Sequence, residues 1–321
     1  MNITILGAGA YALALATRLI KNNNIVIWSA VKEEIDTLSK TKKNDKALKG
    51  VKLSDKIIYT TDIKKALDGS KIVIIAVSTK YLRSVCKEVK PYIKDKHIVI
   101  ASKGIEQESN MFASNIVKEE LKTRKLCTIS GPSFASDMAN DELIGLSLAT
   151  TNNITKKEVL KAFSSDTLKL RVTNDFIGTE LCGTLKNIIA ITSGILDGMN
   201  VSESTKAMFL TESINDTKCL IKKLGGNEKT IMSYAGFGDI LLTASSTTSR
   251  NYTYGKLLAT TPSKAKEYLN NNTIEGVYTL ESIYGLIKSR NVKMPFIDFI
   301  YDVVFEHRKM SDIITFLKEK K

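Results

Sequence analysis

The chain is poor in the residues that build disulfide frameworks and metal sites. Its 321 residues include only 4 cysteines and 2 histidines. The cysteines are scattered and form no Cys-x-x-Cys pair: Cys86, Cys127, Cys182 and Cys219. This spacing argues against both a disulfide framework and a zinc site, so we expect no bound metal.

Long apolar runs and a leader-like start are also absent. No apolar run reaches the ~20 residues that a membrane-spanning helix needs. The first residues read as a strand that runs into a glycine turn, without the basic start and cleavage site of a signal peptide. We therefore expect a cytoplasmic protein without membrane insertion.

Arginine is scarce, although the net charge is +13. Only 7 of the 47 basic residues are arginine, and the lysines are spread along the whole chain. A nucleic-acid-binding protein more often clusters its charge and uses arginine, so we expect no nucleic-acid partner. A positive field still helps to collect a small phosphorylated anion.

The first thirty or so residues carry a dinucleotide-binding pattern. A strand over residues 2–6 is followed by Gly7-Ala-Gly9-Ala10-Tyr11-Ala12, a helix from about Ala10 and a second strand at 25–28. In G-x-G-x-x-G/A the first glycine permits the tight turn and the second lets a pyrophosphate approach the backbone. The N-terminus of the following helix then offers free N–H groups to the phosphates.

The end of the second strand bears on the choice between NAD and NADP. An acidic residue there would bind the ribose hydroxyls of NAD. The chain has Trp28-Ser29-Ala-Val-Lys32, with no acid before Glu33. Ser29 and Lys32 would accept a 2′-phosphate, which leans toward NADP, but the choice stays open.

The remaining pattern predicts two domains, as the length of 321 residues also favours. Further strands are predicted at 71–77, 97–101, 125–130, 143–150 and 168–173, with helices between several of them. Such alternation indicates an α/β fold with a doubly wound, Rossmann-like, mostly parallel sheet. From Asn174 onward the pattern is helical. We expect a dinucleotide-binding domain over 1–173 and an all-α substrate and catalytic domain over 174–321.

Two loops leave the carboxyl ends of predicted strands, where ligands of open α/β sheets lie. Lys103 follows the strand that starts at His97, and would point toward the nicotinamide end. The segment 130–135 contains a Gly-Pro turn and the hydroxyl of Ser133. The alternatives are a solvated loop lysine and a plain turn.

Residues 175–194 are predicted to form one long helix with two different faces. Leu181, Leu185 and Ile188 fall on a side that would face a core. The opposite side carries small groups, which would let a partner approach the backbone: Gly183, Asn187, Ala190 and Gly194. Lys186 lies at the edge of that small-residue face.

Elimination favours Lys186 as the group that supplies a proton when a carbonyl is reduced. His97 opens its strand at the wrong end of the sheet, and His307 lies in a charged run near the C-terminus. Burial beside other cations would lower the pKa of Lys186 toward neutrality. The alternative is a structural lysine paired with Glu180 or Asp239.

Two further segments carry candidate substrate groups. Gly236 and Gly238 form a flexible turn that presents Asp239. Ser249, Arg250 and Asn251 place a guanidinium beside a hydroxyl and an amide, which suits phosphate oxygens. The alternative for this cluster is a helix cap with a surface arginine.

These segments together resemble the bacterial NAD(P)-dependent glycerol-3-phosphate dehydrogenases. The resemblance runs from Gly7 to about Pro295. Its seven motifs, in order, are Gly7-Ala-Gly-Ala-Tyr-Ala-Leu-Ala14, Ser102-Lys-Gly-Ile-Glu106, Gly131-Pro-Ser-Phe-Ala135, Glu180-Leu-Cys-Gly-Thr-Leu-Lys-Asn187, Ala235-Gly-Phe-Gly-Asp239, Ser249-Arg-Asn251 and Ile274-Glu-Gly276. The chain departs from the family at Ala12, where glycine is usual, and at Ser29-Ala30, where a basic residue is frequent.

The resemblance implies specific roles for residues of this chain. Those implied at the cofactor are Ala10, Tyr11, Lys103, Ala135, Arg250, Thr273 and Glu275. Those implied at the substrate are Lys103, Gly131, Ser133, Asp239, Ser249, Arg250 and Asn251. Lys186 is implied as the proton donor and acceptor.

The implied reaction is reversible hydride transfer between NADH or NADPH and dihydroxyacetone phosphate, giving sn-glycerol 3-phosphate. Lys186, Lys103 and Asp239 are the expected catalytic residues. The resemblance also implies a homodimer that supplies phospholipid synthesis. The alternative enzyme is a β-hydroxyacid or 6-phosphogluconate-type dehydrogenase, which also carries a lysine on a helix. A dinucleotide sensor without turnover would have no need of Lys186.

Overall fold

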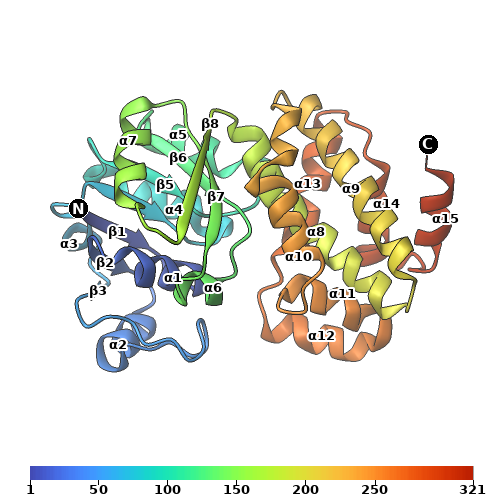
Figure 1. The fold of residues 1–321 in the computed structure, drawn as a ribbon, viewed down its shortest axis with the longest axis horizontal. Helices are drawn as coiled ribbons and strands as arrows, with labels where there is room; N and C mark the ends of the chain where they lie inside the picture. Colours follow the sequence, from blue (N-terminus) through green and yellow to red (C-terminus); the bar gives the residue numbers. More distant parts are fainter. Residues whose placement is uncertain (321) are drawn as a thin grey trace. The chain divides into compact units, whose positions relative to one another are not determined.

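The computed structural model describes residues 1–320, which divide into two compact units (Figure 1). The N-terminal unit consists of residues 1–103 and 112–176, and the described part of the helical unit of 104–111 and 177–320. The short segment 104–111 therefore leaves the unit that precedes it in the sequence. Within the helical unit it is tied to helix α13 (Glu275–Ser289), since Gln107 Nε2 donates to Glu281 Oε2 at 2.7 Å.

One eight-stranded sheet forms the centre of the N-terminal unit. Its strands are β1 (Asn2–Leu6), β2 (Asn24–Trp28), β3 (Ile58–Thr60), β4 (Ile72–Ile75), β5 (His97–Ile100), β6 (Leu126–Ser130), β7 (Ile144–Ala149) and β8 (Leu168–Thr173). They lie in the order β3-β2-β1-β4-β5-β6-β7-β8, and every neighbouring pair is parallel except β6 and β7. The predicted doubly wound, mostly parallel sheet is confirmed.

Helices cover both faces of this sheet, and as a result every residue of β4, β5 and β6 is buried. The α-helices of the unit are α1 (Ala10–Leu19), α2 (Lys32–Thr41), α3 (Ile63–Leu67), α4 (Thr79–Val89), α5 (Ala113–Leu121), α6 (Ala135–Ala139) and α7 (Asn153–Ala162). A 3-10 turn, η1 (Lys90–Tyr92), follows α4. One large apolar cluster joins α1 to the sheet through residues such as Leu13, Leu15 and Ile27.

The strand order places a switch point between β1 and β4. The chain first builds β1, β2 and β3 in one direction and then returns to add β4 on the other side of β1. Ligands of open α/β sheets bind beyond the carboxyl ends of the strands at such a point. The glycine turn that follows β1 lies at this position.

The predicted strands agree with the structure apart from their ends and one omission. The predicted strand at 168–173 has the observed bounds, whereas the one predicted at 71–77 is shortened to Ile72–Ile75. β3 was missed because its 3 residues are too few to show alternation, and Ile58 is 61% exposed at the edge of the sheet.

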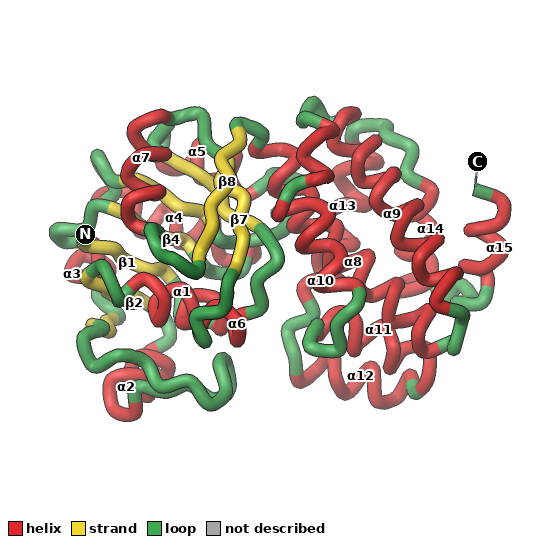
Figure 2. Tube along the Cα trace, in the orientation of Figure 1, coloured by secondary structure: helices red, strands yellow, loops and turns green. Residues whose placement is uncertain are grey.

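The helical unit contains helices and loops only among its described residues (Figure 2). Its α-helices are α8 (Phe176–Gly198), α9 (Glu203–Lys223), α10 (Asp239–Ala244), α11 (Arg250–Thr260), α12 (Pro262–Asn271), α13, α14 (Pro295–Phe305) and α15 (Asp312–Glu319). Two short turns, η2 (Glu228–Met232) and η3 (Tyr234–Gly238), precede α10. Across residues 1–320, no helix is both long enough and apolar enough to cross a bilayer.

Glycines bring α8 and α11 into backbone contact. A Cβ atom on Gly255 of α11 would overlap the carbonyl oxygen of Ile191, and one on Gly194 of α8 would overlap that of Tyr252. The small-residue face predicted on α8 does allow a close approach to the backbone, and at Gly194 the approaching partner is helix α11. Close packing of α11 instead fixes Arg250 and Asn251, which begin α11, relative to Lys186 on α8.

A buried arginine ties the dinucleotide helix α1 to the far half of the sheet. Arg18 is 4% exposed. Its guanidinium donates to the carbonyl oxygens of Met138, Glu142 and Thr167 at 2.8–3.1 Å. It also forms an ion pair with Asp141 at 3.1 Å, and burial lowers its pKa. These bonds hold the α6–β7 connection against α1.

We expect Arg18→Met to destabilise the N-terminal unit by about 3 kcal/mol or more, because it leaves buried carbonyl oxygens and Asp141 without their donor. Chemical unfolding followed by circular dichroism measures the loss. Lys21→Met is the matched control, since Lys21 pairs with the same Asp141 but its side chain is 54% exposed. Its removal should cost less than about 1 kcal/mol. Equal losses in the two variants would contradict the role of Arg18.

Candidate active site

The turn after β1 has the backbone geometry that its glycines predict. Gly7 has φ +118°, and a Cβ there would lie 2.8 Å from the carbonyl oxygen of Ala76. Its N–H donates to the carbonyl oxygen of Trp28 at 2.8 Å. The turn is therefore packed between the ends of β2 and β4, where a side chain would not fit.

Gly9 leaves an open approach to the start of α1. It is the N-cap of the helix, no side chain caps it, and a Cβ added there would meet no atom within 4 Å. The first turn of α1 contains no acidic residue. The N–H groups of a helix N-terminus beside an open, side-chain-free surface fit the pyrophosphate of a dinucleotide. Ala12, by contrast, is fully buried in the core, so the third position of the motif serves helix–sheet packing.

Three predicted site residues from different segments meet beside this turn. The hydroxyl of Tyr11 lies 3.0 Å from Ser133 Oγ, and Ser133 in turn donates to the carbonyl oxygen of Gly131 at 3.1 Å. Lys103 Nζ lies 5.9 Å from the centroid of the Tyr11 ring. Ala135 begins α6 directly after the loop that carries Ser133. The N-terminal unit thus gathers an amine and two hydroxyls at the carboxyl edge of its sheet.

The backbone of Lys103 is held by its neighbours. Thr79 Oγ1 donates to the carbonyl oxygen of Lys103 at 2.6 Å, and Ser102 Oγ donates to that of Val77 at 2.6 Å. Gly104 then turns the chain with φ +110°. Lys103 is half-buried, so its side chain is only partly exposed to solvent.

In the helical unit, Lys186 and Asp239 form a buried ion pair. Lys186 Nζ donates to Asp239 Oδ1 at 2.5 Å, and the side chains are 11% and 1% exposed. Asp239, one of the two acids considered as a partner, thus lies at hydrogen-bond distance from this lysine. A carboxylate at this distance favours the ammonium form, which is the form that can give up a proton.

Gly236 and Thr243 position Asp239. A Cβ on Gly236 would overlap the carbonyl oxygen of Ile231, so only glycine allows the η3 turn to pack at this distance. The turn delivers Asp239 to the first position of α10. Thr243 Oγ1, one helical turn later, donates to the carbonyl oxygen of Asp239 at 2.6 Å. The carboxylate therefore lies on a fixed helix end.

An amide network connects three helices next to this pair. Asn251 Nδ2 donates to Asn187 Oδ1 at 3.1 Å, and Asn251 Oδ1 accepts from the N–H of Gly276 at 2.8 Å. Asn187 Nδ2 donates to Glu275 Oε2 at 3.2 Å. The network fixes the orientation of the Asn251 amide and leaves one of its two N–H groups for another acceptor.

The two residues that precede Asn251 in the sequence differ in burial. Ser249 is buried and caps α11, accepting from the N–H of Tyr252 at 3.3 Å. Arg250, the next residue, is exposed, as are Thr273 and Glu275. The helix cap and the surface arginine of the alternative interpretation are both present, and binding of a phosphate by this cluster stays a prediction.

Neither histidine belongs to these groups. His97 begins β5 at the amino end of the sheet, with Nδ1 2.9 Å from Thr155 Oγ1, and burial lowers its pKa. His307 is exposed beyond the end of α14. Within residues 1–320, no three His, Cys, Asp or Glu side chains gather as metal ligands. The positions expected for the two histidines are therefore confirmed, and the role of Lys186 stays a prediction.

Sequence reasoning missed Asn187 and Thr79 as parts of these groups. Asn187 follows Lys186 directly and was assigned only to the small-residue face, although an amide among glycines and alanines indicates a hydrogen-bonding role. Thr79 has no signal in the sequence, since its contact with Lys103 depends on how the start of α4 meets the loop after β5.

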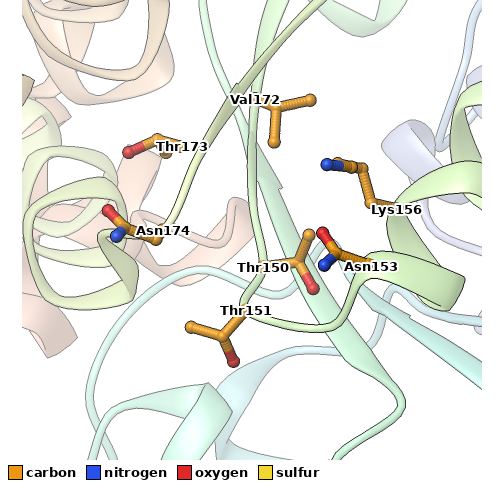
Figure 3. A pocket seen from close by; sticks show the side chains of 7 residues that line it. All are labelled: Thr150, Thr151, Asn153, Lys156, Val172, Thr173 and Asn174. Carbon is orange, nitrogen blue, oxygen red and sulfur yellow. The ribbon is translucent and has the colours of Figure 1, made fainter.

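A separate cavity of about 570 Å³ lies in the N-terminal unit, away from the predicted residues (Figure 3). It is bounded by the carboxyl ends of β7 and β8 and the start of α7. Its lining residues are Thr150, Thr151, Asn153, Lys156, Val172, Thr173 and Asn174. None of the predicted site residues lines it, so its size alone does not make it the active site.

Comparison with known proteins identifies the family. The model described as NAD-dependent glycerol-3-phosphate dehydrogenase N-terminus matches residues 2–156, and its C-terminal counterpart matches 175–315. A Staphylococcus epidermidis protein named glycerol-3-phosphate dehydrogenase [NAD(P)+] is 33% identical over 99% of this chain and 98% of its own. One of the same name from Fusobacterium nucleatum is 32% identical over 100% and 98%.

Solved structures agree with the sequence relatives. The crystal structure of glycerol-3-phosphate dehydrogenase from Coxiella burnetii matches with a TM-score of 0.93 and 27% identity, over 99% of both chains. Two family models that together cover most of the chain, and full-length relatives above 30% identity, leave one assignment. The chain belongs to the NAD-dependent glycerol-3-phosphate dehydrogenase family.

Proposed function

We propose that the chain is an NAD(P)-dependent sn-glycerol-3-phosphate dehydrogenase, which interconverts dihydroxyacetone phosphate and sn-glycerol 3-phosphate. The observation that carries the proposal is the buried ion pair of Lys186 and Asp239 in a chain that also holds a glycine turn fitted to a dinucleotide. The family membership and the names of the relatives support the substrate.

The N-terminal unit is proposed to hold the cofactor. The turn from Gly7 to Tyr11 would contact the pyrophosphate. Ser29 would lie near the adenosine ribose, and Ala135 would contact the cofactor. When bound, the nicotinamide supplies or accepts the hydride. Lys103, at the edge of the same sheet, would contact substrate and cofactor and raise the local positive charge, which favours the oxygen that becomes negative during reduction.

Lys186 is proposed to supply the proton. As hydride adds to the carbonyl carbon, negative charge develops on the oxygen, and the ammonium group of Lys186 donates its proton there. Asp239 would keep the lysine protonated beforehand and hold its Nζ in place, since the two atoms are 2.5 Å apart. In the oxidation direction the neutral amine takes the proton from the substrate hydroxyl.

Arg250 and Asn251 are proposed to bind the phosphate. The guanidinium of Arg250 is exposed at the first position of α11, and Asn251 offers its second N–H beside it. Charge-assisted hydrogen bonds from an arginine suit phosphate oxygens. Ser249 would support this pair mainly as the helix cap. In the N-terminal unit, the loop that carries Gly131 and Ser133 would contact the substrate. Thr273 and Glu275 would lie near the cofactor.

The cellular setting is proposed from the family resemblance. We propose a homodimer in the cytoplasm that supplies sn-glycerol 3-phosphate to phospholipid synthesis. The residues 1–320 contain no helix suited to cross a membrane, which is compatible with this setting.

A substrate panel tests the proposal against the hydroxyacid alternative. We expect rapid NADH or NADPH oxidation with dihydroxyacetone phosphate, and rates lower by about tenfold or more with dihydroxyacetone, because Arg250 would have no phosphate to bind. A panel of β-hydroxyacids and 6-phosphogluconate, assayed with NAD and NADP, should give no turnover. Turnover confined to that panel would support the alternative enzyme class.

A further inference from the structure

A carboxylate from the following helix lies at the end of strand β2, although no acidic residue directly follows the strand in the sequence. Ser29, which directly follows β2, is 5% exposed, and its hydroxyl donates to Glu34 Oε2 at 2.7 Å. The same hydroxyl oxygen accepts the N–H of Val31 at 3.1 Å. Glu34 lies in the first turn of α2, five positions beyond Ser29. The Glu34 carboxylate of this helix thus lies against the end of the strand.

This position lies beside the dinucleotide turn. The carbonyl oxygen of Trp28, the residue before Ser29, accepts the N–H of Gly7 at 2.8 Å. In doubly wound folds, the side chain of an acidic residue near the end of the second strand hydrogen-bonds the adenosine ribose 2′-hydroxyl of NAD. Glu34 brings a carboxylate to that place from the following helix, although the strand itself ends in serine.

The groups expected from the sequence to accept a 2′-phosphate are poorly suited to it. The hydroxyl hydrogen of Ser29 is already donated to Glu34, so Ser29 has no donor left for a phosphate. Residues 19–82 contain no arginine, so none of them can form a bidentate pair with a phosphate. Lys32 is exposed at the first position of α2, with Glu33 and Glu34 following it in the same turn.

We infer that Glu34 makes the enzyme selective for NADH over NADPH. Its carboxylate would accept a hydrogen bond from the 2′-hydroxyl of NADH and would repel the negatively charged 2′-phosphate of NADPH. Selectivity would therefore come from disfavouring NADPH as well as from binding NADH. The inference rests on the proposed function, since it concerns the cofactor of that same reaction.

Binding measurements on the full-length protein without substrate test this inference. Titration calorimetry with NADH and NADPH should show NADH binding roughly tenfold or more tightly, because like charges placed together are strongly unfavourable. Glu34→Gln should strengthen NADPH binding by about tenfold and leave NADH binding within about threefold. AMP and adenosine 2′,5′-bisphosphate, which differ only by the 2′-phosphate, should reproduce the shift without the nicotinamide.

Glu33→Gln is the matched control, because Glu33 is an exposed acid in the same helical turn. It removes the same charge from the helix N-terminus, and should change the NADH-to-NADPH ratio by less than about twofold. Equal binding of the two cofactors by the native protein, or equal effects of the two glutamine variants, would overturn the inference and leave the proposed function intact. Binding of neither cofactor would overturn both.

Discussion

Replacing Lys186 with alanine is expected to lower kcat for dihydroxyacetone phosphate reduction by about 10²–10⁴-fold, the usual contribution of a positioned acid. Cofactor binding should be unchanged, because the glycine turn lies in the other unit of the chain. Steady-state rates and calorimetric titration of the reduced cofactor measure the two effects separately. A comparable loss in cofactor affinity would indicate general damage rather than loss of the acid.

Lys186→Arg separates the chemistry from the stability of the buried pair. Alanine leaves Asp239, whose side chain is 1% exposed, without its cation, which costs about 3–5 kcal/mol. Arginine keeps a positive charge beside the carboxylate but does not release a proton at neutral pH. We expect the arginine variant to melt closer to the native protein than the alanine variant does, and to be as inactive. An active arginine variant would contradict proton donation by Lys186.

Gly255→Ala is expected to destabilise the helical unit by about 3 kcal/mol or more, the upper part of the range for overpacked cores. The added methyl would overlap the carbonyl oxygen of Ile191, and neither backbone can move aside by a rotamer change. The separation of α8 and α11 would increase, which also displaces Asn251 from Asn187. Urea unfolding and the KM for dihydroxyacetone phosphate should both report the change.

Gly285→Ala is the control for this substitution. Gly285 also lies inside a helix, α13, but its added Cβ would meet only the side-chain amide of Asn110, at 2.9 Å. A side chain can rotate away, and alanine favours helix by up to about 1 kcal/mol over glycine. The net change should be within about 1 kcal/mol. Equal losses in both variants would show that glycine flexibility, rather than backbone contact, explains the effect at Gly255.

The N-terminal fold was predictable because its signals are local. The Gly7 turn, the buried strands and the helix after the turn are each specified by residues within a few positions of one another. β3 has no such signal, since its 3 residues are partly exposed. The carboxylate of Glu34 was also missed, because a helix that folds back onto a strand end cannot be read from the order of residues.

The sequence named both partners of the buried pair in the helical unit as candidates, but it did not show which contacts they make. The pattern of α8 identified Lys186 and a face of small residues. It did not distinguish Glu180 from Asp239 as the partner, since the pairing joins residues 53 positions apart. Nor did it show that α11 fills the face at Gly194, because small residues permit close approach by a helix and by a ligand equally.

The most direct test of the account is the product formed by the native enzyme. Dihydroxyacetone phosphate and NADH are mixed with the protein, the loss of reduced nicotinamide is followed by absorbance, and sn-glycerol 3-phosphate is quantified with a stereospecific assay. The account predicts one molecule of sn-glycerol 3-phosphate for each NADH consumed. A folded protein that binds NADH but forms no sn-glycerol 3-phosphate would contradict it.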